Sequence, residues 1–519
     1  MNNDIYYRPP WTCGKYNADK HVAILFNLLS KRNYFFEDDS ADVIRCVLDV
    51  GRSGIIHVNE VSNKYNISSA SIAEFFSKLC LMGLLSNKRI TDKEITNYRI
   101  KCKEEETLPP PIAGTRAEEL TNNGIQSAYQ AYANAVCDNT ILTDVMFELT
   151  YRCQEQCVHC YNPGATRNNS ERSGRGDIEE LTRDDYKRII DDLCDHGLTT
   201  ATITGGDPFM HPFVWQIIDY LYRKDIATII YTNGLGLVGK EECLASYYPY
   251  KVQCSIYSGD PAVHDKITRT KNSWKRTINV MDKLHELGIP IEVACPIMQT
   301  NLKTYFSVKP YMKKYGSSLA FDVMLTDSID GDQCVSHHLR LTPEQLSVVL
   351  LDEDVIQHIN LHRLNDDNIT DRSFLNGPPC GVLKNSFCIN PNGNLTPCCA
   401  FNKIIGNIKH QSIAEIVLAS DFIKKWFQTK ETDYGECFKK EYCYYCYFCP
   451  GNNYTAHKEY LNGCENNCYL AKIRYNTAKR YHSGEDILQG KTLEEYIQDM
   501  EVSIGDLHRE YNKKGTETL

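Results

Sequence analysis

Three cysteines in the stretch YRCQEQCVHCYNPG are spaced for metal chemistry. Cys153, Cys157 and Cys160 follow a C-x3-C-x2-C pattern. Three thiolates this close together can each hold one iron of a [4Fe–4S] cube and leave the fourth iron open to a small molecule. The same spacing also suits three of the four ligands of a structural zinc ion. Spacing alone leaves both interpretations open, so the sequence that follows has to decide between them.

Composition narrows the class of protein. The chain has 519 residues, room for two to four domains, and its formal net charge of -10 argues against a general nucleic-acid binder. The N-terminus MNNDIYYRPP does not read as a signal peptide, and no apolar run is long enough to span a bilayer. Twenty-three cysteines without an export signal favour metal or redox chemistry over disulfides. We expect a cytoplasmic protein that binds neither nucleic acid nor membrane.

The region from 144 to 330 alternates strand-like and helix-like segments. Its strand-like runs are VMFELTY, TATITGGDP, ATIIYTNG, KVQCSIYS, IPIEVACPIMQTN and LAFDVMLT. Strands that alternate with helices are typical of a parallel sheet, so we expect an α/β fold with a partial (β/α)6 barrel. Sites in such folds lie at the carboxyl ends of the strands, and the cysteine motif follows the first strand of the series.

Glycine and polar residues follow the other strands. The glycine pair allows the backbone to approach a ligand closely, and the carboxylate after it suits an ammonium group. The hydroxyls and the amide suit a ribose or a carboxylate, and the arginine can pair with a ligand carboxylate. His264 and Asp265 are expected to organise the loop before that arginine. The candidate contacts are Gly205, Gly206, Asp207, Thr232, Asn233, Ser255 and Arg269.

The ordered combination of C-x3-C-x2-C, GGDP, TNG and SIYSGDPAVHDKITR resembles the radical SAM superfamily over roughly residues 145 to 325. The resemblance implies a [4Fe–4S] cluster whose open iron chelates S-adenosyl-L-methionine (SAM). It also implies cleavage of SAM to a 5′-deoxyadenosyl radical, with the strand-end residues and Tyr161 as cofactor contacts. Asp207 stands where the family usually has glutamate, which shortens the side chain in the amine-binding motif. No catalytic residue is assigned beyond the cluster cysteines.

Residues 14–100 read as a small winged-helix-like domain. DNA binding is disfavoured because the second helix of its helix pair carries Glu74 and only Lys78 as a cation. The layout resembles the RiPP recognition element, which implies that the leader of a ribosomal precursor peptide adds a strand to an exposed sheet edge. A purely structural domain is the other interpretation. Residues 101–143, which include KCKEEETLPPPIAG, are expected to form a linker with a helix.

A bridging region (331–376), a cysteine-rich region (377–470) and a helical tail (471–519) complete the expected domains. In CGVLKNSFCINPNGNLTPC, the NPNG turn predicts a hairpin that brings Cys380 and Cys398 together. The region resembles the SPASM extension, which implies two auxiliary [4Fe–4S] clusters, although Lys440 occupies one cysteine position of that pattern. A pair of zinc sites is the alternative. The implied ligands are Cys380, Cys398 and Cys449 for one cluster, with or without Cys388, and Cys437, Cys443, Cys446 and either Cys468 or Cys464 for the other.

The order of the three modules resembles maturases of ribosomally made peptides, of the sactipeptide and ranthipeptide type. It implies an oxidoreductase-like enzyme that abstracts hydrogen from a leader-bound precursor peptide and forms a thioether crosslink, with flavodoxin or ferredoxin as electron donor. Carbon–carbon crosslinking, epimerisation or oxidation of a peptide on the same scaffold remain alternatives. Two more distant alternatives are an anaerobic sulfatase-maturing enzyme and an iron–sulfur winged-helix regulator.

Overall fold

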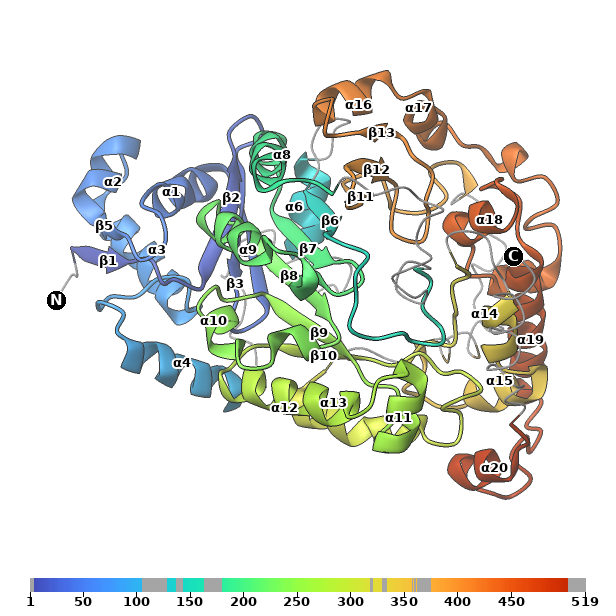
Figure 1. The fold of residues 1–519 in the computed structure, drawn as a ribbon. Coiled ribbons are helices and arrows are strands. Elements are labelled where there is room, and N and C mark those ends of the chain that lie inside the picture. The colour runs from blue at the N-terminus through green and yellow to red at the C-terminus, as the bar shows by residue number, and fades with distance from the viewer. Residues whose placement is uncertain are drawn as a thin grey trace.

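The computed structural model describes residues 4–104, 128–136, 143–162, 180–317, 321–328, 334–356, 358, 361 and 375–502. An N-terminal unit and a cysteine-rich C-terminal region lie on opposite sides of a central sheet (Figure 1). In these described ranges, no helix combines the length and the apolar character that crossing a membrane requires.

Five parallel strands form the central part of the sheet. They are β6 (Asp144–Glu148), β7 (Thr200–Thr204), β8 (Ala227–Thr232), β9 (Lys251–Ser255) and β10 (Ile291–Ala294). Their order in space is β10-β9-β8-β7-β6, so each strand lies beside its neighbour in sequence. The sixth predicted strand is reduced, in the described residues, to Phe321 and Asp322, and Asp322 bridges in parallel to Pro296. The parallel α/β series predicted from the sequence is confirmed.

Helices cover the outer face of these strands because alternate strand residues are apolar. Val145 and Phe147 of β6 pack into the main core, whereas Met146 and Glu148 point to the opposite face. The covering helices include α8 (Arg183–Asp195), α9 (Val214–Arg223), α10 (Glu241–Ala245), α11 (Pro261–Thr268), α12 (Ser273–Glu286) and α13 (Lys309–Tyr315). Helix α8 begins with a capping box between Thr182 and Asp185.

The cysteine-rich region extends the same sheet. Strand β11 (Ser386–Ile389) pairs in parallel with β6 and places Cys388 opposite Met146. Strand β12 (Asn394–Thr396) returns antiparallel to β11, and β13 (Gly406–Asn407) pairs with β12. The predicted NPNG hairpin is therefore present, with Gly393 at φ +83° in its turn. Its union with the central strands into one eight-stranded sheet was not predicted.

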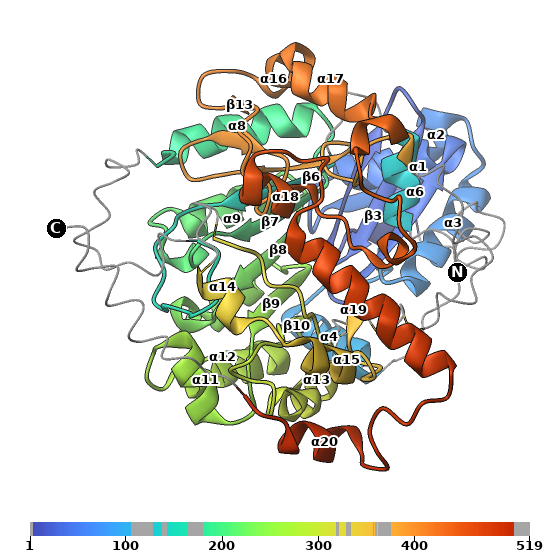
Figure 2. The ribbon, with the colours of Figure 1, turned by 90° about the vertical axis from the view of Figure 1, so that its right-hand side faces the viewer.

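Helices surround the remainder of the C-terminal region. They are α14 (Cys334–Leu339), α15 (Pro343–Val349), α16 (Ile413–Ala419), α17 (Asp421–Phe427), α18 (Pro450–His457), α19 (Glu465–His482) and α20 (Leu493–Asp499). Helix α19 runs obliquely across this side of the molecule (Figure 2). It continues through the boundary predicted at residue 470, and buried Arg474 stacks on the Tyr447 ring at 4.6 Å. The start of the predicted tail is thus part of the packed domain.

The N-terminal unit contains two small sheets and a helical layer. Strands β2 (Thr12–Asn17), β3 (Val22–Asn27) and β4 (Arg32–Glu37) form an antiparallel sheet in that order. Strand β1 (Ile5–Tyr7) pairs with β5 (Ile55–His57), so the unit extends ahead of the boundary predicted at residue 14. Its helices are α1 (Asp38–Asp49), α2 (Val58–Tyr65), α3 (Ser69–Leu81) and α4 (Asp92–Glu104), and α6 (Ala128–Val136) packs on β3 and β4.

The two faces of the β2–β4 sheet have different partners. One face packs against helices α1 to α3 through side chains such as Leu25 and Phe36. The other carries Phe26 and Phe35, which share a cluster with Ala227 at the start of β8. The N-terminal unit therefore lies against the amino ends of the central strands, away from the carboxyl ends where the cysteine motif follows β6.

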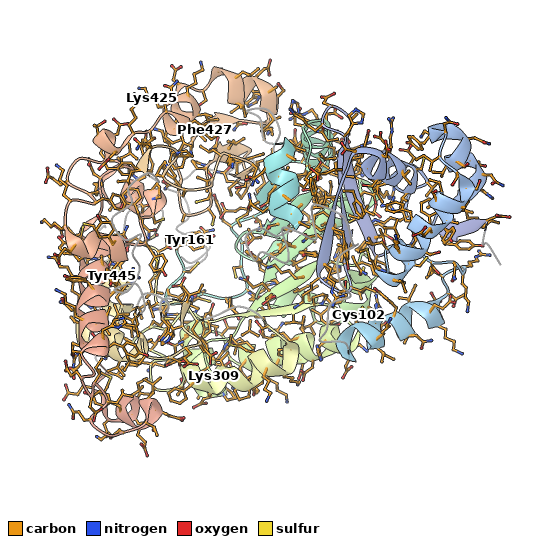
Figure 3. The ribbon with its side chains drawn as sticks, turned by 180° about the vertical axis from the view of Figure 1, so that it is seen from behind. Cys102, Tyr161, Lys309, Lys425, Phe427 and Tyr445 are labelled. Atoms are coloured by element: carbon orange, nitrogen blue, oxygen red, sulfur yellow. The ribbon has the colours of Figure 1, made fainter. Side chains whose placement is uncertain are left out.

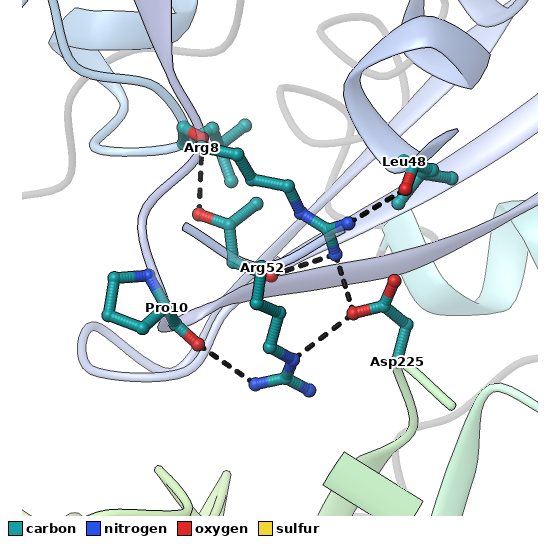
Figure 4. A network of polar contacts seen from close by, with 7 residues as sticks. Arg8, Pro10, Leu48, Arg52 and Asp225 are labelled. Atoms are coloured by element: carbon teal, nitrogen blue, oxygen red, sulfur yellow. Dashed lines mark hydrogen bonds and ion pairs between the residues drawn. The ribbon is translucent and has the colours of Figure 1, made fainter. Parts of the chain in front are cut away.

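A buried polar network joins the N-terminal unit to this end of the sheet (Figure 4). Arg8, with no exposed surface, donates to Asp225 Oδ1 at 2.6 Å and to the carbonyl of Leu48 at 3.0 Å. Arg52 donates to the same carboxylate oxygen at 3.1 Å and stacks on Tyr222 at 4.0 Å. Because two guanidinium groups share one carboxylate, the contact fixes the unit to the loop between α9 and β8.

Candidate functional site

The three motif cysteines lie in the loop that leaves β6. Cys153 Sγ accepts a hydrogen bond from the Glu155 backbone N–H at 3.4 Å, and Cys157 Sγ lies 3.4 Å from Glu155 Oε2. Cys160 Sγ lies 3.5 Å from the carbonyl oxygen of Asn162. The backbone of this loop is held against α11, because the Gln156 N–H donates to the Thr268 carbonyl at 3.0 Å.

Burial makes these cysteines poor thiolates when nothing is bound to them. It raises the pKa of Cys153 to about 12 and that of Cys160 to about 11, and it raises the pKa of Cys157 well above its ordinary value of 9.0. Repulsion from Cys160 adds to burial at both Cys153 and Cys157, so the three sulfurs interact with one another. Such thiols ionise when a metal centre stabilises their negative charge.

The chemistry of the side chains in this loop suits an iron–sulfur cluster. A cube takes one cysteine per iron, so its ligands surround a larger volume than the four ligands of zinc. The loop also holds buried polar atoms without a protein partner, Glu155 Oε1 and His159 Nδ1. The residues present therefore fit an iron–sulfur cluster.

The two glycines after β7 let the backbone pass close to the cysteine loop. A Cβ at Gly205 would lie 2.3 Å from the Thr150 carbonyl oxygen, and one at Gly206 would lie 2.3 Å from the Arg152 carbonyl oxygen. The Gly206 N–H donates to Thr150 O at 2.6 Å and the Asp207 N–H to Arg152 O at 2.9 Å. The GGD backbone thereby fixes the residues that lead into Cys153.

Asp207, Thr232 and Asn233 form one hydrogen-bonded group at the ends of β7 and β8. Asp207 has no exposed surface, and its Oδ2 accepts from the Thr232 hydroxyl at 2.5 Å and the Asn233 N–H at 3.1 Å. Its Oδ1 accepts from the Phe209 N–H at 3.0 Å. Burial nevertheless leaves the pKa of Asp207 above its ordinary value. Asn233 in turn donates to Cys153 Sγ at 3.4 Å. The structure thus brings three of the predicted contact residues together beside the first cysteine.

The loop after β9 is organised as the sequence predicted. Asp265 Oδ1 accepts from the Ser273 hydroxyl and the Trp274 N–H, both at 2.9 Å. His264 Nδ1 accepts from the Tyr257 N–H at 3.3 Å, and its ring stacks on that of Tyr257. Arg269, at φ +52°, ends α11 and is half-buried. Ser255 lies half-buried at the end of β9.

Glu148, at the end of β6, is a site residue that the sequence reading did not select. Its Oε1 accepts from the Tyr161 hydroxyl at 3.2 Å and its Oε2 from the Tyr151 hydroxyl at 3.5 Å. Burial raises the pKa of Glu148 to about 7. Tyr161 lies between the central strands and the C-terminal region (Figure 3), and it also hydrogen-bonds to Cys399. The one available signal was a single acid within the apolar strand VMFELTY.

The structure brings Cys380, Cys398 and Cys449 together. Burial raises the pKa of Cys398, and repulsion from the thiols of Cys449 and Cys380 adds to that rise. Cys449 precedes α18 and accepts from the Asn452 N–H at 3.4 Å. Cys388 is fully buried on β11, and repulsion from Glu148, Cys399 and Cys398 adds to burial in raising its pKa. Cys399, next to Cys398 in the chain, lies near Tyr161.

A second set of sulfurs gathers before and within the start of α19. Cys437 Sγ accepts from the Gly463 N–H at 3.0 Å, and a Cβ on that glycine would lie 3.0 Å from Cys437 Sγ and 3.8 Å from Cys468 Sγ. Burial raises the pKa of Cys446. Repulsion from Cys468, and to a smaller extent from Cys437 and Cys443, adds to that rise. For Cys464, the charges of Asp327 and Arg340 act more strongly than Cys468 does. Cys464 thus has charged neighbours in addition to the cysteines of this set.

Comparison with known proteins identifies both cysteine regions. Residues 147–301 match the radical SAM superfamily, and residues 380–450 match SPASM, an iron–sulfur cluster-binding domain. On this fold the two matches define the class: the chain is a radical SAM enzyme that carries a SPASM domain. Its cofactors are a [4Fe–4S] cluster with SAM, and auxiliary iron–sulfur clusters in the SPASM domain.

Named relatives and one solved structure extend the comparison. The antilisterial bacteriocin subtilosin biosynthesis protein AlbA of Bacillus subtilis is 29% identical over 66% of this chain and 72% of its own length. The sporulation killing factor maturation protein SkfB of the same organism is 23% identical over 65% of this chain and 80% of its own. SuiB of Streptococcus suis bound to S-adenosylmethionine shares the fold, with a TM-score of 0.51 and 15% identity over 89% of this chain and 100% of that one.

Proposed function

We propose that this enzyme matures a ribosomally made precursor peptide and forms a thioether crosslink in it. The observation that carries the proposal is an unpaired sheet edge on the N-terminal unit, which is bonded to the domain of the SAM site. In the described part of the chain, no strand pairs with the outer edge of β4, and the β2–β4 sheet is fixed to the barrel by Arg8 and Asp225. An unpaired edge accepts an extended peptide as an added strand. AlbA, named for biosynthesis of the bacteriocin subtilosin, and SkfB, named for maturation of the sporulation killing factor, support the proposal of a peptide maturase.

The position of that edge constrains the precursor. The β2–β4 sheet lies at the amino ends of the central strands, and the motif cysteines follow their carboxyl ends. Strand β8 has six residues, which correspond to about 20 Å at 3.3 Å per residue. A leader held on β4 must therefore be followed by enough chain to pass the length of the barrel before the modified residues reach the site.

In this proposal the cysteines divide into three ligand sets. Cys153, Cys157 and Cys160 hold the SAM-binding cluster. When bound, this cluster and SAM would supply a 5′-deoxyadenosyl radical for removal of a hydrogen atom from the substrate, and the auxiliary clusters would supply an acceptor for the electron released as the new bond forms. The hydrogen-bonded pair of Glu148 and Tyr161 lies between the SAM site and Cys399, which follows the β11–β12 hairpin. We assign Cys380, Cys398 and Cys449 to one auxiliary cluster, with Cys388 nearby, and Cys437, Cys443, Cys446 and Cys468 to the other.

The overall reaction can be read from the mass of the peptide. A thioether forms when one C–H and one S–H bond of the peptide break and a C–S bond replaces them, so the product is lighter by two hydrogens. A small electron donor such as flavodoxin or ferredoxin would supply the electron for SAM cleavage. Such chemistry needs a reducing compartment, which favours the cytoplasm.

Co-expression with each short open reading frame beside the gene tests this function. Mass spectrometry of a cysteine-containing product should show the loss of two hydrogens, with fragment ions that place the link between a cysteine and a second residue. An epimer would show no change of mass, and a carbon–carbon crosslink would leave the cysteine free to react with an alkylating reagent. Either of these results would reject the thioether and retain a peptide maturase.

A proline on β4 tests the binding edge separately. The Asp38 N–H donates to the His21 carbonyl at 2.8 Å, and by continuation of the β3–β4 register the Asn33 N–H points away from β3. Asn33→Pro removes that outward N–H, and an edge strand tolerates proline at such a position. We expect about fivefold weaker binding of the leader in fluorescence anisotropy, the effect of roughly one hydrogen bond.

Asn33→Ala is the matched control for this variant. It removes the same side chain, including its bond to the Tyr129 N–H at 2.9 Å, and keeps the backbone donor. The alanine variant should bind the leader as the wild type does, and both variants should cleave SAM without peptide at the wild-type rate. Equal affinity of the proline and alanine variants would reject β4 as the binding edge.

A further inference from the structure

The side chain of Asn233 links the end of β8 to a cysteine of the SAM site. Its Nδ2 donates to Cys153 Sγ at 3.4 Å and to Gln154 Oε1 at 3.2 Å. Asn233 is half-buried and directly follows β8. It belongs to the TNG segment, which the sequence predicts to contact the cofactor. It therefore reaches the first cysteine of the motif from a neighbouring strand rather than from the cysteine loop itself.

Other hydrogen bonds fix the orientation of this amide. Asn233 Oδ1 accepts from the Leu235 N–H at 2.8 Å, so the oxygen has a donor of its own. Rotation of the amide by 180° would set Oδ1 against the sulfur and Gln154 Oε1, and Nδ2 against a donor. Three favourable contacts would become unfavourable, so the NH2 group must face Cys153.

Asp207 holds the backbone of Asn233 in place. Its carboxylate accepts the Asn233 N–H, the Thr232 hydroxyl and the Phe209 N–H, and it also bonds to the Gln154 side chain. With no exposed surface, the carboxylate is enclosed by groups of the chain itself. Its hydrogen bonds point toward the residues that carry Asn233 and toward the residue after Cys153.

We propose that Asn233 sets the reduction potential of the SAM-binding cluster through its N–H···S bond to Cys153, and that Asp207 is a positioning residue that keeps Asn233 in reach. Reduction adds negative charge to a cluster, and a hydrogen bond to a ligand sulfur stabilises that charge. The bond therefore raises the potential and makes reduction easier. Residues behind the metal ligands commonly orient and tune them in this way. The proposal concerns the SAM site alone and is independent of the peptide substrate.

Redox titration followed by electron paramagnetic resonance tests the role of Asn233. The full chain with all its clusters is titrated anaerobically, and the signal that changes on addition of SAM is assigned to the SAM-binding cluster. Asn233→Ala should shift the midpoint of this signal to a more negative potential. Asn233→Asp should shift it further, because a carboxylate near the sulfur adds repulsion to the loss of the donor.

Asn407→Ala is a matched control. That amide is also fully engaged, with Nδ2 donating to Asn394 Oδ1 at 2.9 Å and to the Asn392 carbonyl at 3.1 Å, but it lies on β13. Its substitution should leave the SAM-sensitive midpoint unchanged. An unchanged midpoint in Asn233→Ala with wild-type iron content would overturn the proposal.

A double-mutant cycle tests the role of Asp207. Asp207→Glu keeps the carboxylate charge but moves its oxygens by one methylene away from the Asn233 N–H and the Thr232 hydroxyl, so the midpoint should again become more negative. Because Asp207 acts through Asn233, the double variant should match Asn233→Ala alone rather than show the sum of both shifts. Additive shifts, or weaker SAM binding in calorimetry with an unchanged midpoint, would show that Asp207 acts on SAM directly. If Asn233→Ala fails to retain its cluster, the same criteria apply to Asn233→Asp and Asp207→Glu.

Discussion

Arg8 and Asp225 form an ion pair at 2.6 Å between two domains, although more than two hundred residues separate them in the chain. The guanidinium of Arg8 is inaccessible to solvent, and the Asp225 side chain retains 20% exposure. Arg52 shares the carboxylate at 3.1 Å. An ion pair of this kind holds domains in register because each charge would be costly to leave unpaired in the interior. The proposed leader-binding unit is thus a fixed part of the enzyme.

Asp225→Ala should destabilise the protein strongly. The substitution leaves Arg8 and Arg52 buried without their carboxylate, and the loss of one partner of a buried pair costs about 3 kcal/mol. We expect a lower urea midpoint for the unfolding of the N-terminal unit, followed by tryptophan fluorescence, since Trp11 lies in the cluster at this interface.

Asp219→Ala on the preceding helix is the control. Asp219 pairs with Arg223 at 2.7 Å, but that arginine is 71% exposed, and exposed pairs of this type contribute less than about 1 kcal/mol. Similar midpoints for the two variants would contradict the structural importance of the buried network.

The sequence predicted those parts of the fold that local pattern determines. Alternation of strands and helices indicated the parallel series, and each chemical motif was placed at a strand end, where the structure has the Cys153 loop, Asp207 and Ser255. The NPNG hairpin was likewise predictable from its turn. These features depend on residues close together in the chain.

Features that depend on distant partners were not predictable. The pairing of β11 with β6 joins segments that lie far apart in the chain. Nothing in the residues of the strand SFCI indicates which strand it pairs with. The same holds for Arg8 with Asp225, since a surface arginine and a buried one look alike in sequence. The sequence did not indicate Glu148 as a site residue, because its role depends on hydrogen bonds from Tyr161 and Tyr151 that only the fold creates.

Cys157→Ala should abolish the cleavage of SAM. The variant removes one of the three sulfurs that gather in the loop after β6, and a cluster left with two cysteines in this loop cannot be held there. Chromatography of the reaction with dithionite should show no 5′-deoxyadenosine. Cys194→Ala, which alters a cysteine on the buried face of α8 in the apolar core, should still produce it. Formation of 5′-deoxyadenosine by Cys157→Ala would remove this loop as the SAM site.

Glu148 should make stability depend on pH. Its pKa is about 7 in the folded protein against an ordinary value of 4.5, so the folded state favours the protonated carboxyl. This contribution to stability is complete below pH 4.5 and is lost as the pH rises through about 7. Between pH 6 and pH 8 the wild type should lose about 1 kcal/mol relative to Glu148→Gln, which cannot ionise.

Urea midpoints of the two proteins across that range provide the measurement. The comparison cancels the titration of groups that both proteins share. A constant difference between wild type and Glu148→Gln from pH 6 to pH 8 would mean that Glu148 ionises as an exposed glutamate does.

Cys468→Ala and Cys464→Ala should differ in iron content. The Cys468 sulfur flanks Gly463 together with Cys437, and its charge adds to the rise in the pKa of Cys446, whereas Cys464 has the charged groups of Asp327 and Arg340 near it. We therefore expect Cys468→Ala to lose up to about four irons per chain, the content of one cube. Cys464→Ala should keep the wild-type iron content and the wild-type Mössbauer spectrum, because it removes a buried thiol outside the ligand set. Both variants should still cleave SAM without peptide. Loss of iron from Cys464→Ala alone would exchange the two cysteines in the assignment, and loss from neither would exclude both as ligands.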